Sequence, residues 1–166
     1  MIGNELTRTN VINTFSQLLR LGVIPIVNEN DTVATDELEG ANIGDNDTLS
    51  AYVAKLVTAD FLILITDTDG LYDRDPSSTS DTTEQNCTDP ESAVPKLLHD
   101  VTEITPEIEA MAGKPSSSFG TGGMATKIAA AKISKDAGIP CAIVSGHDPN
   151  NLYRIFDGEE IGTIFW

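Results

Sequence analysis

The sequence predicts an α/β fold, a three-layer αβα sandwich in which helices cover both faces of a mainly parallel sheet. Segments with apolar residues at helical spacing alternate three times with short all-apolar runs, which are typical of buried parallel strands. The chain has 166 residues and is 40% apolar, which suits one domain with a substantial core. We therefore expect helices and strands to alternate along a single domain.

The first cycle is predicted to be a helix over residues 6–21 followed by a strand over 23–27. Apolar side chains recur at helical spacing and end at a glycine stop, Gly22: Val11, Ile12, Phe15, Leu18, Leu19. The run after Gly22 is entirely apolar, although Pro25 removes one hydrogen-bond donor from a ladder. The pattern therefore favours a buried strand with an uncertain register.

Two further cycles follow. Asp45 or Asn46 can cap a helix whose apolar face ends near Val57, and residues 61–65 then form a second all-apolar strand. An alanine-rich helix over 124–137, stopped by Gly138, precedes a third strand over 140–144.

The stretch between the second and third cycles is more irregular. Residues 77–92 are almost wholly polar and cannot bury enough apolar surface, so we interpret them as a surface loop or insertion. A short strand at 97–98 and a helix over 105–111 with Pro106 in its first turn complete the expected elements.

The composition excludes several classes of protein. Ten basic and 26 acidic residues give a formal net charge of −16, which repels both nucleic acid and anionic membranes. No apolar run is long enough to span a membrane and no signal peptide is evident, so we expect a cytoplasmic protein. Cys87 and Cys141 lie in different contexts and predict no disulfide or metal site, and the isolated His99 and His147 are assigned no role.

The stretch 120–127, GTGGMATK, carries the chemistry of a phosphate-binding site. Its three glycines give an anion access to backbone N–H groups, the start of a helix adds its positive dipole end, and Lys127 adds a charge. The spacing matches neither the P-loop nor the dinucleotide-binding fingerprint. Considered alone, Gly122 and Gly123 could also be a flexible loop entering a surface helix.

Three polar segments are candidate ligand sites because two follow apolar strands and one begins a helix. Residues 28–31 (NEND) and 66–70 (TDTDG) come directly after predicted strands, where open α/β sheets bind ligands, although turn chemistry also explains such residues. Residues 45–47 (DND) exceed what one helix cap needs, which leaves at least one side chain to orient a lysine or a metal.

Taken together and in this order, the three motifs NEND, GDND and GTGGMATK resemble the amino acid kinase family. Within it, they are most similar to the members that phosphorylate the side-chain carboxylate of L-glutamate in proline biosynthesis. The resemblance implies transfer of the ATP γ-phosphoryl group, with Mg²⁺ bridging the phosphates and retaining several waters. It also implies that Lys127 neutralises charge on the transferring group and that Asp47 orients Lys127. We expect Lys127 to matter for ATP and hardly for stability.

The resemblance also assigns binding residues. Asp31 and Asn46 correspond to glutamate-binding positions, with Asn28 and Asp45 close by. The nucleotide-binding positions that it implies are Thr66, Asp67, Thr121, Gly122, Gly123, Met124, Ala125, Thr126 and Lys127.

The sequence departs from the family at its front. Family members begin with a strand and a Gly/Ser-rich phosphate loop that bears another lysine, and this sequence starts after both. We therefore expect residues 1–166 to be a partial amino acid kinase domain, incomplete at the N-terminus, with the ATP subsite, part of the glutamate subsite and weak or no turnover alone. An incomplete sheet also predicts homo-oligomers or other association. Two alternatives stay open: a non-catalytic nucleotide- or amino-acid-binding module that needs a partner, and a kinase of this family with another acceptor.

Overall fold

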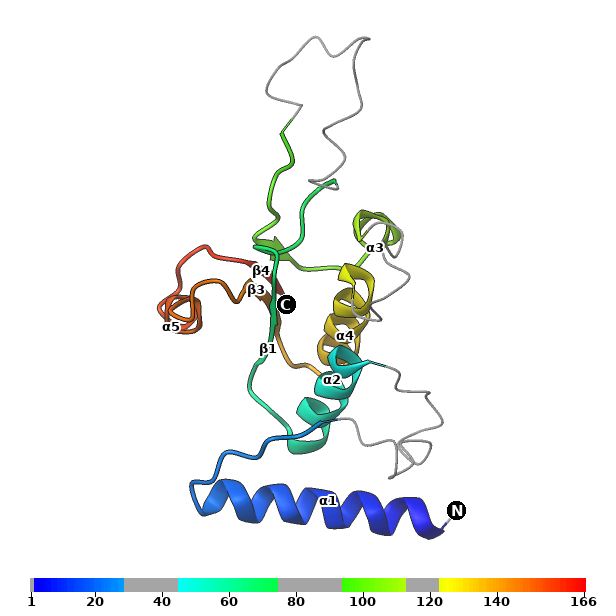
Figure 1. Cartoon of the computed structure of the whole chain (residues 1–166). Helices are drawn as coiled ribbons and strands as arrows, with labels where there is room; N and C mark the ends of the chain where they lie inside the picture. Colours follow the sequence, from blue (N-terminus) through cyan, green and yellow to red (C-terminus); the bar gives the residue numbers. More distant parts are fainter. Residues whose placement is uncertain (1, 29–44, 75–93, 113–122) are drawn as a thin grey trace.

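The computed structural model describes residues 2–28, 45–74, 94–112 and 123–166. The elements found in these ranges mix helices and strands, which confirms the α/β class expected from the sequence (Figure 1). In chain order they are α1 (Ile2–Arg20), α2 (Asn46–Val57), β1 (Leu62–Thr66), β2 (Asp100–Val101), α3 (Pro106–Met111), α4 (Met124–Asp136), β3 (Cys141–Ser145), α5 (Asn151–Phe156) and β4 (Thr163–Phe165).

The four strands of the described residues form one sheet in the order β1-β3-β4-β2. β1 runs parallel to β3, with Leu62 opposite Cys141 and Thr66 opposite Ser145, and β2 runs parallel to β4. β3 and β4 are antiparallel. The sheet is therefore mainly parallel, as expected, with one antiparallel joint that the sequence did not predict.

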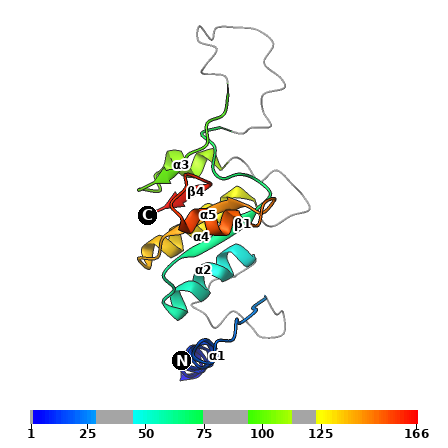
Figure 2. The ribbon, with the colours of Figure 1, turned by 90° about the vertical axis from the view of Figure 1, so that its left-hand side faces the viewer.

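Helices cover both faces of this sheet. α2 and α4 pack against each other on one face, and α5 lies on the other (Figures 1 and 2). Side chains of β3 alternate between the two layers: Cys141 and Ile143 join the larger core cluster with α2 and α4, whereas Ala142 and Val144 pack with Ile155 of α5. This alternation is the period of two that a strand buried on both faces requires.

The helices begin and end close to where the sequence predicts. Gly22 and Gly138 adopt left-handed φ angles of +70° and +75° after α1 and α4, as a glycine stop requires. Thr105 caps α3 in front of Pro106. None of the helices in the described ranges is long and apolar enough to cross a membrane. The polar stretch 77–92 lies outside the described residues.

The predicted strand over 23–27 is wrong for this structure. The segment is irregular, and the sheet pairings among the described residues do not include it. Ile24 and Ile26 are 86% and 96% exposed. An apolar run becomes a strand only where a neighbouring strand offers its hydrogen-bonding edge, and this run lies instead beside α1 and α2, away from the sheet (Figure 1).

Two C-terminal elements, α5 and β4, were not predicted from the sequence. The short strand predicted at 97–98 lies further along the chain in the structure. Leu97 makes only an isolated antiparallel bridge to Tyr72, and the strand itself is β2 at Asp100–Val101. These elements have six, three and two residues. They are too short to show a period, so tertiary pairing decides them.

Candidate functional site

The starts of α2 and α4 lie at the same edge of the sheet as the carboxyl ends of β1 and β3. Short connections join α2 to β1 and α4 to β3, so each helix runs antiparallel to the strand that follows it (Figure 1). Open α/β sheets bind ligands at this edge. The fold therefore brings DND at 45–47, TDTDG and the end of GTGGMATK, which are far apart in the sequence, to one side of the molecule.

Asp45 is the residue that caps α2. Its Oδ1 accepts the Thr48 backbone N–H at 2.7 Å, and its Oδ2 accepts the Thr48 hydroxyl at 2.9 Å. Both carboxylate oxygens thus serve the helix start, as in an ordinary N-cap. The glutamate-binding role suggested for Asp45 stays a prediction.

Asp47 is directed away from the cap and toward α4. Its Oδ2 lies 3.1 Å from Lys127 Nζ and 2.8 Å from Thr126 Oγ1. The side chains of Lys127 and Asp47 are only 10% and 19% exposed. The pair joins residues 80 positions apart and holds the ammonium group at the first turn of α4.

The burial of Lys127 revises one expectation. We expected this residue to have hardly any effect on stability, as an exposed helical lysine would. Its exposed fraction is 8% and its partner is a mostly buried carboxylate, so removal of the ammonium group would leave that carboxylate without its counter-ion. Lys127 is therefore part of the packing between α2 and α4 as well as a candidate phosphate ligand.

Thr126 shares the carboxylate of Asp47 with Lys127. Its hydroxyl also lies 2.7 Å from the Gly123 carbonyl. A hydroxyl has one proton, so it donates to one of these two acceptors at a time. Thr126 can therefore hold Asp47 in place, or turn to Gly123 while Lys127 alone holds it.

The start of α4 has the features of an anion site. Gly123 is its N-cap and no side chain caps it. The first turn of any α-helix leaves backbone N–H groups without an intrahelical acceptor, and these, with the helix dipole, attract a phosphate. Met124 and Ala125 lie in this turn, which Lys127 completes. Thr121 and Gly122 lie outside the described residues.

The negative charge of Asp47 also affects the pKa of Cys141, a residue of β3. Burial and, to a smaller extent, the negative charge of Asp47 raise the pKa of the Cys141 thiol to about 12. Cys141 therefore stays a protonated thiol at neutral pH and is a packing residue, in line with its complete burial.

Thr66 and Asp67 follow β1 at the same edge. The Thr66 hydroxyl donates to Asp67 Oδ1 at 3.1 Å, and the Thr66 carbonyl accepts the Gly146 N–H at 2.8 Å. The Asp67 carbonyl lies 3.1 Å from His147 Nε2. Sequence reasoning gave His147 no role; the available signal was its position just after an apolar strand, β3, which matches that of Asp67 after β1.

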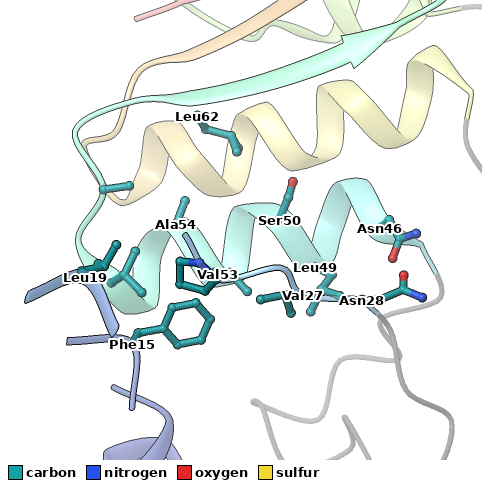
Figure 3. Close-up of a pocket in the computed structure, with 13 residues that line it drawn as sticks. Phe15, Leu19, Val27, Asn28, Asn46, Leu49, Ser50, Val53, Ala54 and Leu62 are labelled. Carbon is teal, nitrogen blue, oxygen red and sulfur yellow. The ribbon is translucent and has the colours of Figure 1, made fainter. Parts of the chain in front are cut away.

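A cavity of about 510 Å³ opens on the other side of α2, toward α1 (Figure 3). Asn28 and Asn46, two of the predicted glutamate-binding residues, lie at the same end of it, whereas Asp31 is outside the described residues. Ser50 adds a hydroxyl and the other described lining residues are apolar, among them Phe15, Leu19, Val27, Leu49, Val53 and Leu62. Only the asparagine end is thus suited to a polar ligand.

The described part of the chain contains no group of three or more His, Cys, Asp or Glu side chains that could hold a metal ion. Magnesium in phosphoryl-transfer sites is held largely by the phosphates, water and one or two carboxylates. The described carboxylates at this edge, such as Asp47 and Asp67, therefore fit a Mg²⁺ carried by a nucleotide better than a dedicated metal site.

Comparison with known proteins identifies the class. The model of the amino acid kinase family matches residues 3–145, and the chain belongs to this family. A solved structure of UMP kinase from Bacillus anthracis superposes with a TM-score of 0.57 over 95% of this chain and 50% of that one, at 16% identity. This likeness supports the fold alone.

The curated relatives are more specific. Glutamate 5-kinase of Clostridium perfringens is 47% identical over 166 residues, which cover 99% of this chain and 57% of that protein. Glutamate 5-kinase of Moorella thermoacetica is 52% identical over 156 residues, or 94% of this chain and 37% of that protein. The chain thus spans about half the length, or less, of these relatives.

Proposed function

We propose that the chain carries the nucleotide-binding part of a glutamate 5-kinase, which transfers the γ-phosphoryl group of ATP to the side-chain carboxylate of L-glutamate. The identity of 47–52% to glutamate 5-kinases over nearly the whole chain supports this reaction. The observation that carries the proposal is the buried Lys127–Asp47 pair at the uncapped start of α4. It combines a fixed cation with free helical N–H groups, which is what a phosphate chain needs.

In this proposal the residues divide the work of charge neutralisation and positioning. Lys127 neutralises negative charge on the transferring phosphoryl group, and Asp47 keeps its ammonium group at the start of α4. Backbone N–H groups from Gly123 to Ala125 bind phosphate oxygens, with Thr121 and Gly122 preceding them in the sequence. Phosphoryl transfer depends mainly on such positioning and electrostatic stabilisation.

Thr66 and Asp67 complete the proposed nucleotide site from the end of β1, together with Thr126 at the start of α4. Mg²⁺ would be held by the phosphates and would supply charge neutralisation there. The chain's own contribution is to bind the nucleotide at the edge where β1 and β3 end.

The glutamate subsite is proposed at the polar end of the cavity beside α2. Asn28 and Asn46 offer amide groups there, and Asp31 and Asp45 complete the set implied by the family. No charged side chain lines the cavity among the described residues. Any charged side chain that binds glutamate must therefore come from outside this set of lining residues.

The proposal includes a partial domain over residues 1–166, with a loop or insertion at 77–92, and a cytoplasmic location, where ATP is available.

β1 is an edge strand of the sheet in the described residues, which supports association through that edge. Size-exclusion chromatography tests this; a stable monomer at high concentration contradicts it.

Calorimetric titration of MgATP into the chain tests the nucleotide site. We expect wild type to bind, and Lys127→Met to bind about tenfold or more weakly, because a charge-assisted contact is worth about 1.5–3 kcal/mol. Lys132→Met is the matched control: Lys132 lies on the same helix and pairs with Glu109, but both side chains are about half exposed. Absence of MgATP binding by wild type, or equal affinity in both variants, contradicts the proposal.

The acceptor is tested by titrating glutamate, acetylglutamate, aspartate and UMP in turn, with ADP release measured in a coupled assay. Glutamate is expected to bind best, with slow or no turnover in the chain alone. Preference for another acceptor would overturn the assignment to glutamate and keep the kinase family.

A further inference from the structure

We propose that His147 is a positioning residue for the nucleotide: its imidazole holds the turn after β1, residues 66–70, in the shape that the nucleotide site needs. The inference rests on the proposed function, because Thr66 and Asp67 are the nucleotide residues of that turn. It concerns a residue that the family resemblance does not assign and that touches the turn through the backbone of Asp67.

The contact extends the pairing of β1 with β3 beyond the strands. The two strands end side by side, with Thr66 opposite Ser145. Past this point the Gly146 N–H donates to the Thr66 carbonyl at 2.8 Å, and His147 Nε2 lies 3.1 Å from the Asp67 carbonyl. One backbone bond and one side-chain bond therefore tie the two chain segments together where the sheet itself stops.

The direction of the bond from His147 follows from its partner. A carbonyl oxygen only accepts, so Nε2 must carry a proton and donate. Both the neutral tautomer with the proton on Nε2 and the imidazolium meet this condition.

His147 is well anchored on its own side. Asn151 of α5 donates through Nδ2 to the Ser145 carbonyl at 3.1 Å, and the His147 N–H lies 3.4 Å from Ser145 Oγ. A Cβ at Gly146 would lie 2.6 Å from Ile65 Cγ2, so a residue without a side chain is needed for this close approach. The imidazole thus projects from a fixed backbone toward β1.

The turn after β1 has few bonds of its own. Thr66 and Asp67 bond to each other, but the buried Thr68 hydroxyl has no hydrogen-bond partner in the part of the chain that the structure describes. Bonds from outside therefore carry a larger share of the order of this turn. Loss of the imidazole would free the Asp67 carbonyl at the first residue past the strand.

The test compares wild type with His147→Leu, His147→Gln and His99→Leu. Glutamine can donate to the same carbonyl and should rescue, whereas leucine cannot donate. His99 is the control histidine: its Nδ1 lies 3.2 Å from the carbonyl of Gly162, which neighbours Gly70 at the far end of the turn rather than Thr66 and Asp67. MgATP affinity, glutamate affinity and melting temperature are measured for all four.

We expect His147→Leu to weaken MgATP binding by about threefold to tenfold, the range for one net hydrogen bond, with glutamate binding unchanged. His147→Gln should lie within about twofold of wild type, and His99→Leu should not change MgATP affinity. MgATP binding by His147→Leu equal to wild type, failure of glutamine to rescue, or an equal loss in His99→Leu overturns the inference.

Amide hydrogen exchange without nucleotide separates this inference from the proposed function. Residues 66–70 should exchange faster in His147→Leu than in wild type and recover in His147→Gln. Unchanged exchange refutes the role of His147 in holding the turn, even if MgATP binds. Failure of wild type to bind MgATP refutes the proposed function, and the exchange rates then still decide whether His147 holds the turn.

Discussion

Replacement of Lys127 by methionine should destabilise the fold as well as weaken nucleotide binding. Methionine keeps the apolar stem and the helix propensity, and it removes only the ammonium group. At a separation of 3.1 Å and an effective dielectric constant of about 20, the attraction to Asp47 is about 5 kcal/mol before the cost of desolvation.

The net effect depends on burial. Exposed ion pairs contribute about 0.2–1 kcal/mol, whereas removal of one partner from a fully buried pair costs about 3–5 kcal/mol. With side chains 10% and 19% exposed, this pair lies between the two cases, and Thr126 still donates to Asp47 in the variant. We expect a loss of about 2 kcal/mol, or about 4–8 °C in melting temperature for a domain of this size.

A double-mutant cycle measures the interaction directly. Urea unfolding of wild type, Lys127→Met, Asp47→Asn and the double variant should give a coupling free energy of about 1–2 kcal/mol, because both single variants remove the same contact. The same cycle on Lys132 and Glu109, a pair with a shorter N–O distance of 2.7 Å but about half exposed, should give less than about 1 kcal/mol. Additivity within about 0.5 kcal/mol at Lys127 and Asp47 would refute the argument from burial.

Three further predictions test the fold. Gly162→Ala should destabilise by more than about 2 kcal/mol, because a Cβ there would overlap the Ile143 carbonyl, whereas Gly158→Ala, also at a left-handed φ but with open space, should cost about 1 kcal/mol by chemical unfolding. The Cys141 thiol has a pKa of about 12 in the folded protein and about 8.5 in the unfolded chain, so above pH 8.5 the unfolded state loses its proton first. The free energy of unfolding of wild type should therefore fall by about 1.4 kcal/mol per pH unit relative to Cys141→Ala. Equal slopes for the two proteins would contradict the burial of the thiol. Ile26→Ser should change the free energy of unfolding by no more than about 0.5 kcal/mol, because Ile26 is 96% exposed, and a loss of 2 kcal/mol would indicate a buried strand over 23–27 instead.

Local sequence predicted those elements whose signal is local. The strands at β1 and β3 follow from apolar runs, and α2, α3 and α4 follow from apolar spacing, caps and glycine stops. The run at 23–27 is as apolar as β1 but forms no strand, because apolar composition does not report whether a neighbouring strand edge is present. β4 was missed because its three residues depend on Val101 and Cys141 as partners rather than on any pattern of their own.

The candidate site was predictable in its residue types but not in how they divide the work. The sequence indicated that DND at 45–47 exceeds the needs of one cap, yet which aspartate caps the helix and which meets Lys127 depends on a partner 80 positions away. The burial of Lys127 was not predictable either, because it results from the packing of α2 against α4.

The start of α2 explains how one short motif can contribute to two subsites. Successive residues of a helix diverge by about 100°. Asn46 therefore lines the cavity on the side of α1, next to Asn28, while Asp47 turns toward α4 and the Lys127 ammonium. In the proposed reaction the acceptor carboxylate and the transferring phosphoryl group must meet at one point. The start of α2 satisfies this requirement, because Asn46 on one side can bind glutamate and Asp47 on the other orients the phosphate-binding lysine. Asp45 fixes the position of both residues through the cap.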